Sequence, residues 1–309
     1  GKVLNKIENE KNYFFIETQH QFKHQQIQKE SNNRDEWIVL ADCRFDNKMQ
    51  LIDEFKLDSS LSDEDFILEL YKLYGNNFPK MLAGPFTFSI YNKRDNSIFI
   101  ARDHFGQRPL FYSSTETKFI FSSAILSITN QLKHRRPNLN KIKRFIISEE
   151  KKSNQTFYKN ISKLMPGHFL IIKKGEAEQV KYFSLKDQKI NNNYNEKETI
   201  KKFHNIFKEV IKSQLNSTNS TIASTLSGGL DSSSISLMLD KVALNKNISA
   251  YSVNFYGIDD AEYKKTYEKN FVLDVLDDSN LRHKEIDLLY EDSGPFKSKN
   301  SKSFYHEPY

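Results

Sequence analysis

Short apolar runs separated by polar turns fill the chain from about residue 37 to residue 183. Residues 37–41 are typical of a buried strand, and residues 86–91 and 97–101 flank a turn-rich connector. This spacing predicts an antiparallel hairpin. Further strands are expected at residues 118–122, 168–172 and 179–183. Few helical patterns interrupt these strands, so we expect an α+β first domain built as a two-layer sheet sandwich covered by helices.

A helix with both ends marked is predicted between residues 62 and 75. Ser62 can cap its N-terminus, an acidic first turn follows, and Asp65 stands at the capping-box position. Gly75 suits the position after the last turn, because glycine readily adopts a left-handed backbone. The expected apolar face consists of Phe66, Ile67, Leu70, Leu73 and Tyr74.

The second half of the chain changes to a pattern in which strands and helices alternate. Residues 184–195 are rich in lysine and asparagine and are expected to link two domains. Residues 196–215 predict a long helix with an apolar stripe. The stripe consists of Ile200, Phe203, Phe207, Val210 and Ile211. Strands are then expected at residues 220–226, 248–255 and 283–286, with helices near 234–240 and 261–276. This alternation predicts a doubly wound parallel sheet, with a ligand at the C-terminal ends of its strands.

Composition narrows the class of protein. The chain has 309 residues, 38% of them hydrophobic and 28% charged, which allows two globular domains with separate cores. No apolar run approaches the length of a membrane span and no secretory leader is visible, so we expect a cytoplasmic protein that does not bind membranes. The single cysteine, Cys43, excludes an internal disulfide and a cysteine-rich metal site. The net charge of +6 is spread along the chain, so nucleic-acid binding is not expected.

Residues 227–233, with the sequence Ser-Gly-Gly-Leu-Asp-Ser-Ser, lie between a predicted strand and a predicted helix. Two glycines let the backbone approach a ligand, and the free N–H groups of the first helical turn then point at one spot. The serine hydroxyls add donors for phosphate oxygens, and Asp231 would meet phosphate through a bridging Mg²⁺. The lysine-containing loop of common nucleotide-binding proteins is absent, which favours a pyrophosphate group that is bound and released. A serine-rich helix cap is the alternative.

Four motifs occur in the order found in one family of two-domain enzymes. They are Ser62-Asp63 with its helix, residues 101–112, Leu164-Met165-Pro166-Gly167-His168, and the loop at residues 227–233. Together they resemble the glutamine-hydrolysing asparagine synthetases and their relatives, the β-lactam synthetases and lasso-peptide cyclases. The resemblance extends from about Trp37 to the end of the chain. In our interpretation, Arg102 and Asp103 form a structural ion pair that holds the hairpin and have no catalytic role.

The resemblance implies two domains. Residues 1–183 would form a class II glutamine amidotransferase-like domain of the N-terminal-nucleophile type, an αββα sandwich. After a linker at residues 184–195, residues 196–309 would form an incomplete ATP-pyrophosphatase domain with an α/β doubly wound parallel sheet. In this family ATP, with Mg²⁺, adenylates a carboxylate and releases pyrophosphate. Ammonia from glutamine, or an amine, then attacks the acyl-adenylate.

The site residues implied by the resemblance fall into three groups. The ATP and pyrophosphate ligands are Ser227, Gly228, Gly229, Asp231, Ser232 and Ser233, with Asp231 also the Mg²⁺ ligand. The adenine contacts are Leu226 and Val253, and the glutamine ligands are Asp63 and Asp42. No catalytic residue is assigned, because Gly1 stands where the family has its cysteine nucleophile and the catalytic lysine is not found in this chain. We therefore expect a truncated chain or a branch without glutaminase.

Three functions stay open at this point. Asparagine synthesis from aspartate, with ammonia from glutamine, is the first. The second is a macrolactam or β-lactam-type cyclase without glutaminase activity. Asp42-Cys43-Arg44 favours it, because glutamine-using members carry Asn-Gly-Glu there and an arginine should repel the amine of glutamine. The third is a non-catalytic scaffold. The expected partners are small molecules, namely aspartate or another carboxylate and glutamine or ammonia, and a homodimer is the candidate assembly.

Overall fold

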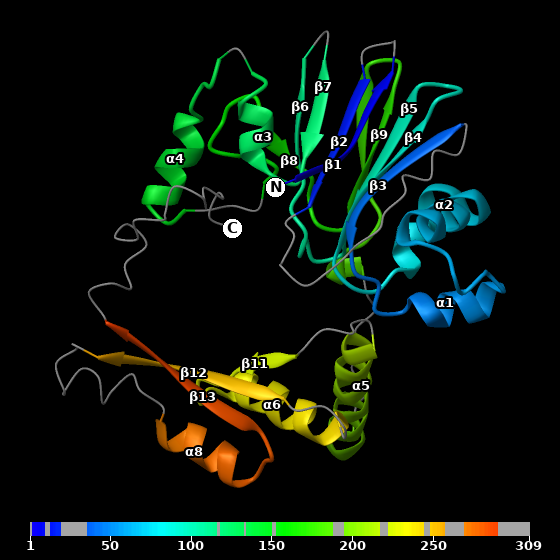
Figure 1. Ribbon diagram of the computed structural model, residues 1–309. Coiled ribbons are helices and arrows are strands. Elements are labelled where there is room, and N and C mark those ends of the chain that lie inside the picture. The colour runs from blue at the N-terminus through cyan, green and yellow to red at the C-terminus, as the bar shows by residue number, and fades with distance from the viewer. Residues whose placement is uncertain are drawn as a thin grey trace. The chain divides into compact units, whose positions relative to one another are not determined.

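A computed structural model describes residues 2–9, 13–19, 36–115, 118–132, 134–149, 153–187, 195–216, 222–243, 248–256 and 269–289. The chain forms two compact units, one made of residues 1–188 and the other of residues 189–308 (Figure 1). This division falls inside the segment 184–195 that we expect to link the domains. Within the described ranges, no helix has the length and apolar character needed to cross a membrane.

Two antiparallel sheets form the centre of the first unit. The larger has five strands in the order β10-β9-β5-β4-β3, and the smaller has three in the order β7-β6-β8. Their bounds are β3 Trp37–Cys43, β4 Phe86–Asn92, β5 Ser97–Arg102, β6 Phe111–Ser114, β7 Phe119–Ser122, β8 Ser162–Lys163, β9 His168–Lys173 and β10 Glu176–Lys181. A separate pair is formed by β1 (Lys2–Asn9) and β2 (Tyr13–Gln19). The predicted hairpin is confirmed, since β4 and β5 are antiparallel neighbours in which Tyr91 pairs with Ile98.

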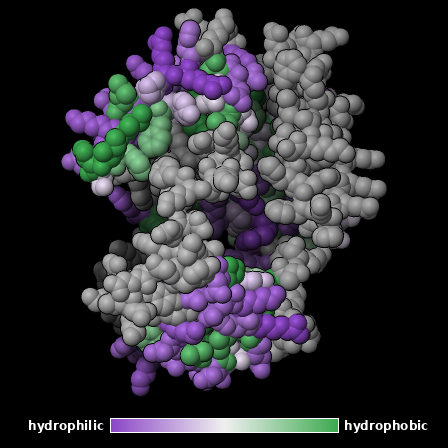
Figure 2. Space-filling view, turned by 60° about the vertical axis from the view of Figure 1, so that its left-hand side comes forward, coloured by the Kyte–Doolittle hydropathy of each residue, from purple (hydrophilic) through white to green (hydrophobic). Residues whose placement is uncertain are grey.

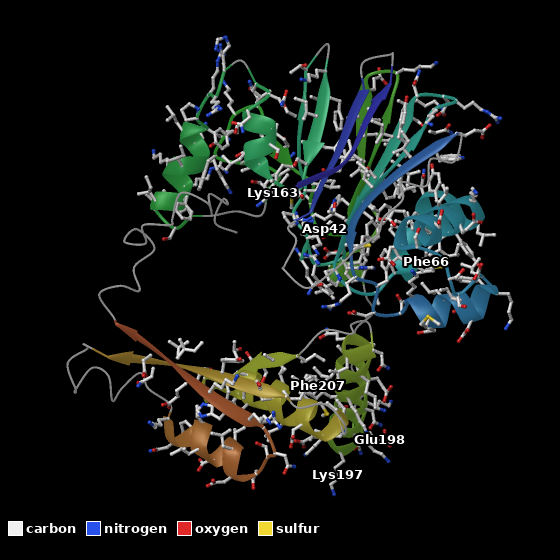
Figure 3. All side chains as sticks on the ribbon, viewed as in Figure 1. Asp42, Phe66, Lys163, Lys197, Glu198 and Phe207 are labelled. Atoms are coloured by element: carbon white, nitrogen blue, oxygen red, sulfur yellow. The ribbon has the colours of Figure 1, made fainter. Side chains whose placement is uncertain are left out.

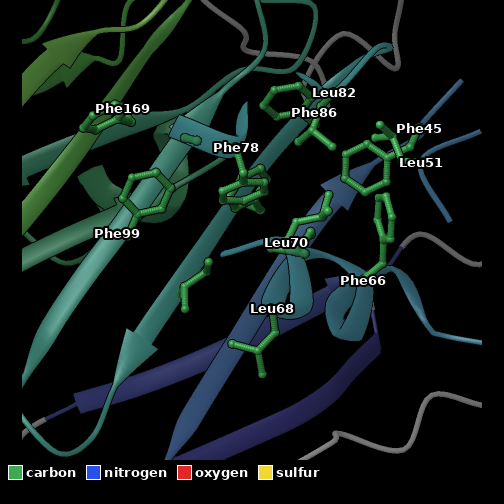
Figure 4. Packing of buried hydrophobic residues seen from close by; sticks show 14 of the residues in the cluster. Phe45, Leu51, Phe66, Leu68, Leu70, Phe78, Leu82, Phe86, Phe99 and Phe169 are labelled. Atoms are coloured by element: carbon green, nitrogen blue, oxygen red, sulfur yellow. The ribbon is translucent and has the colours of Figure 1, made fainter. Parts of the chain in front are cut away.

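Both faces of the five-stranded sheet are buried at its inner strands, because side chains along β4, β5 and β9 alternate between two apolar clusters, whereas the edge strand β10 is mostly exposed. In β5, Phe99 and Ala101 belong to one cluster, whereas Ile98 and Ile100 belong to the other. The first cluster joins the sheet to helices and is rich in aromatic rings (Figure 4). The second cluster joins the two sheets through residues such as Tyr112 of β6.

Helices cover the outer sides of this sandwich. On the larger sheet lie α1 (Lys48–Phe55), α2 (Asp63–Tyr74) and the 3-10 helix η1 (Gly75–Met81). Ile125 and Ile128 of α3 (Ile125–Thr129) pack on Phe111 of the smaller sheet, and α4 (Leu139–Ile146) follows. The layers are therefore helix, sheet, sheet, helix, as the sequence predicts.

The predicted caps of α2 are confirmed. The Ser62 hydroxyl accepts a hydrogen bond from the Asp65 N–H at 3.1 Å, and Gly75 after the last turn has a φ of +56°. The predicted apolar face is wrong at its C-terminal end, because Leu73 and Tyr74 are exposed. The Tyr74 ring packs on Phe55 of α1, with ring centroids 5.0 Å apart, and so faces the neighbouring helix instead of the sheet.

The loop after β5 is built around two buried charged side chains. The Arg102 guanidinium donates to the backbone carbonyls of Gly106, Arg108 and Leu164 at 2.6–2.7 Å. The Asp103 carboxylate accepts three backbone N–H groups of the next five residues at 2.9–3.1 Å. Both side chains therefore hold the loop backbone, and the ion pair that we expect between them stays a prediction.

The second unit contains a three-stranded parallel sheet in the order β11-β12-β13. Its elements are α5 Glu196–Asn216, β11 Ala223–Thr225, α6 Leu230–Val242, β12 Ser249–Tyr256, α8 Lys269–Asp277 and β13 Arg282–Leu289. The predicted alternation of strands and helices is thus confirmed. Of the helix predicted at residues 261–276, residues 261–268 lie outside the described residues, and α8 contains the rest.

The apolar stripe predicted for α5 is only partly buried. Ile211 and Leu215 pack against Met238 and Leu239 of α6, because the C-terminal half of α5 contacts that helix. The prediction is wrong at Ile200, Phe203 and Val210, whose side chains are exposed. Hydrophobic residues also reach the surface elsewhere, as separate patches among hydrophilic residues in Figure 2.

Candidate functional site

The loop at residues 227–233 connects the end of β11 to the start of α6. Gly228 has a φ of +88°, a conformation that residues with a Cβ rarely adopt. Gly229 is the N-cap residue of α6, and because glycine has no side chain, it makes no side-chain capping hydrogen bond. The N–H groups of the first turn of α6 are therefore not capped by the residue before them, and the positive end of the helix dipole lies at this loop.

The serine hydroxyls predicted to bind phosphate gather in this loop. The Oγ atoms of Ser227 and Ser232 lie 3.0 Å apart, and the Ser227 N–H donates to the Ser232 Oγ at 3.2 Å. The Ser232 hydroxyl also donates to the Gly229 carbonyl at 3.2 Å. The Ser233 Oγ is buried and has no hydrogen-bond partner within the described part of the chain. A buried hydroxyl without a partner is unfavourable, so this atom is a candidate donor to a bound ligand.

Asp231 lies exposed in the first turn of α6. No cluster of three or more histidine, cysteine, aspartate or glutamate side chains that could hold a metal ion occurs among the residues described. A single carboxylate fits Mg²⁺, because this ion is commonly held by one or two carboxylates together with the phosphates of a substrate. The Mg²⁺ ligand role of Asp231 stays a prediction.

The two predicted adenine contacts lie in different environments. The Leu226 side chain is fully buried in a core cluster with Ala250 and Val272. Its N–H donates to the Tyr251 carbonyl at 2.8 Å, and its carbonyl accepts from the Ser252 hydroxyl. Val253 is partly exposed on β12. The side chain and both backbone groups of Leu226 therefore make contacts inside the second unit, whereas the Val253 side chain is partly accessible at the surface.

The two predicted glutamine ligands of the first unit each face a basic side chain. The Lys48 Nζ lies 2.8 Å from the Asp63 Oδ1 and donates to the Leu61 carbonyl at 2.7 Å. Asp42, near the end of β3 (Figure 3), has its Oδ1 3.3 Å from the Arg108 Nε. The next residue, Cys43, donates its thiol to the Asp63 Oδ2 at 3.8 Å. The structure therefore brings the two carboxylates to one end of the sheet, each with a cation beside it.

Two domain families match the chain. A model of the glutamine amidotransferase domain matches residues 21–183, which are more than half of the chain, and a model of asparagine synthase matches residues 202–296. The chain belongs to the asparagine synthetase family. The fold agrees with the resemblance seen in the motifs.

Relatives in this asparagine synthetase family are moderately similar. The glutamine-hydrolysing asparagine synthetase 2 of Bacillus subtilis is 28% identical over 225 residues, which cover 69% of the chain and 30% of the relative. An asparagine synthetase homologue of Methanocaldococcus jannaschii is 28% identical over 240 residues, 75% of the chain and 46% of the relative. Amidase chyE of Penicillium rubens is 28% identical over 193 residues, 62% of the chain and 28% of the relative. The chain thus spans less than half the length of these relatives.

Among solved structures, the glutamine phosphoribosylpyrophosphate amidotransferase of Bacillus subtilis aligns with 71% of the chain and 46% of its own chain, at 15% identity and a TM-score of 0.33.

Sequence reasoning missed several neighbours of the site in this asparagine synthetase-family chain. Lys48 and Arg108 come from elements far from the carboxylates that they contact, and Ser252 lies 26 residues from Leu226. Arg108 lay inside a recognised motif, but nothing in that motif pointed to Asp42. Nothing in the sequence indicated a role for Ser252, because a single serine in a strand is common.

Proposed function

We propose that the protein is an ATP-dependent, AMP-forming amide ligase that adenylates a carboxylate, with aspartate as the first substrate to test. The loop at residues 227–233 carries this proposal. It combines a glycine with positive φ, a helix start without a side-chain cap, and a buried Ser233 hydroxyl lacking a partner among the described residues. Each of these features suits a polyphosphate anion.

The chemistry follows from the needs of a carboxylate. A carboxylate oxygen attacks the α-phosphorus of ATP, the bond to the pyrophosphate oxygen breaks, and pyrophosphate leaves with the electron pair. An amine then attacks the acyl carbon and AMP departs. The loop N–H groups and the hydroxyls of Ser227, Ser232 and Ser233 would hold the pyrophosphate and stabilise the charge that it gains. When bound, Mg²⁺ neutralises part of that charge, and Asp231 would hold it.

Exchange of labelled pyrophosphate into ATP tests this proposal in the complete gene product. Exchange that requires aspartate supports adenylation of aspartate and an asparagine-forming reaction. Exchange that requires a different carboxylate, such as a peptide acid, keeps the ligase proposal and rejects aspartate. Absence of exchange with every acid tested overturns the proposal and favours a non-catalytic scaffold.

A second candidate, a macrolactam or β-lactam-type cyclase without glutaminase activity, is favoured by the ion pairs of the first unit. The Lys48 ammonium lies between the Asp63 carboxylate and the Leu61 carbonyl, which are the kinds of group that an amino-acid ammonium would need. A positively charged amine of glutamine would have to displace Lys48 or share Asp63 with it. Electrostatic repulsion at this distance disfavours that binding.

Release of glutamate from glutamine distinguishes the two candidates. We expect no release in the wild-type protein if the cyclase candidate is correct. Lys48→Met should then give measurable binding of glutamine by calorimetry, because it frees Asp63, whereas Lys118→Met at an exposed site should not. Glutamate release by the wild-type protein at rates that match amide formation would reject the cyclase candidate.

A further inference from the structure

The peptide group between Leu226 and Ser227 is held at both of its ends. Its carbonyl oxygen accepts a hydrogen bond from the Ser252 hydroxyl of β12, and its N–H donates to the Ser232 Oγ of α6 at 3.2 Å. A peptide group is planar, so two such contacts fix how this plane is turned. The loop at residues 227–233, called the phosphate loop below, begins at this peptide plane, because Gly228 and Gly229 follow directly.

This attachment is needed because β11 ends early. The parallel pairing of β11 with β12 stops at Thr225 opposite Tyr251, one residue before Leu226. The Leu226 N–H still donates to the Tyr251 carbonyl, but no backbone N–H among the described residues donates to the Leu226 carbonyl, and a buried carbonyl must find a partner elsewhere. The Ser252 hydroxyl fills this position from a side chain that is only 4% exposed.

The Ser252 hydroxyl is itself oriented by His283. The His283 Nε2 lies 2.9 Å from the Ser252 Oγ. A serine hydroxyl carries one proton, and Ser252 donates it to the Leu226 carbonyl, so the Oγ can only accept from His283. His283 must therefore carry a proton on Nε2.

The register of the sheet explains how His283 reaches this serine. His283 of β13 pairs with Ala250 of β12, so Ser252 is two residues further along the same face. Such diagonal neighbours are within reach of a long side chain. On β11, Ser224 contacts the hydroxyl of Ser236 in α6 at 2.9 Å.

We propose that His283, acting through Ser252, is a positioning residue for the phosphate loop. The inference rests on the proposed function, since the loop is taken to bind the pyrophosphate part of ATP. His283 touches no substrate in this proposal. Its Nε2–H holds the Ser252 hydroxyl toward the Leu226 carbonyl, and that contact fixes the peptide plane from which the turn at Gly228 and Gly229 starts.

Substitutions at His283 separate the hydrogen bond from the bulk of the side chain. Glutamine places an amide N–H near the position of Nε2, asparagine is too short to do so, and leucine has no donor. We expect His283→Leu and His283→Asn to raise the KM for ATP in pyrophosphate exchange by about three- to tenfold. His283→Gln should stay near the wild-type value. As a control, Lys284→Gln should leave the KM unchanged, because Lys284 contacts the Tyr251 ring and not Ser252.

Coupling to Ser252 makes the test specific. Ser252→Ala should raise the KM as much as His283→Leu, and the double variant should be no worse than either, because both break one chain of contacts. Equal KM values for the glutamine and leucine variants, or additive effects in the double variant, would overturn the proposal. If the leucine variant does not fold, the glutamine and asparagine variants decide by themselves.

A readout without turnover separates this inference from the proposed function. Nitrogen-15 NMR of the wild-type protein should show His283 with its proton on Nε2, and Ser252→Ala should change that signal. A wild-type protein with no pyrophosphate exchange but with this tautomer would reject the ligase and keep the contact chain. A proton found on Nδ1 alone would reject the contact chain whether or not exchange occurs.

Discussion

Replacing Ser233 with alanine should affect stability and ATP use in opposite directions. The Ser233 Oγ is buried and lacks a hydrogen-bond partner within the described residues. A serine kept for a ligand would remain without one until the ligand binds.

The expected sizes follow from the two environments of the hydroxyl. Burying a polar group without a partner costs about 1–3 kcal/mol, and alanine is also a slightly better helix former than serine. Since Ser233 is only partly buried as a residue, we expect the free energy of unfolding to stay constant or to rise by about 1 kcal/mol. A hydrogen bond to a charged phosphate contributes about 1.5–3 kcal/mol, so the KM for ATP should rise about ten- to hundredfold.

Urea unfolding and pyrophosphate exchange measure the two effects on the same preparation. Ser234→Ala is the matched control, because Ser234 is the next residue on α6 and is exposed. The control should change neither quantity appreciably. A Ser233→Ala variant that is destabilised by more than about 1 kcal/mol, with an unchanged KM for ATP, would refute the assignment of this hydroxyl to the ligand.

Three further predictions concern Asp231, Phe66 and His104. Asp231→Ala should abolish Mg²⁺-dependent pyrophosphate exchange while the melting temperature stays constant, because the residue is exposed; normal exchange in a folded variant would refute the metal role. Phe66→Ala should lower the free energy of unfolding by about 3–5 kcal/mol in a denaturant titration, because its ring is fully buried; a loss below about 1 kcal/mol would contradict the packing. Burial among aromatic rings lowers the pKa of His104 below its usual 6.5, so the unfolded chain takes up the proton first as the pH falls. Stability should therefore decrease below about pH 6.5, and His104→Phe should weaken that decrease; an unchanged pH profile would exclude this cause.

Much of the fold could be predicted because its signals are local. The cap at Ser62, the turn between β4 and β5, and the glycine turn before α6 each depend on a few adjacent residues. The errors came where burial depends on distant elements. The exposed Phe203 has the same periodicity as the buried Ile211, and only the contact of α6 with one half of α5 separates them.

The sequence alone made the loop at residues 227–233 the candidate phosphate site, because glycine conformation, serine donors and a helix start are properties of neighbouring residues. It also showed the family, since four motifs stand in a fixed order. Only the tertiary structure placed the Lys48 ammonium beside the Asp63 carboxylate and brought the His283–Ser252 pair to the Leu226 carbonyl. Those contacts join residues that are 15–31 positions apart. Strand register and helix packing bring these side chains together, and the spacing of residues along the chain carries no information on either.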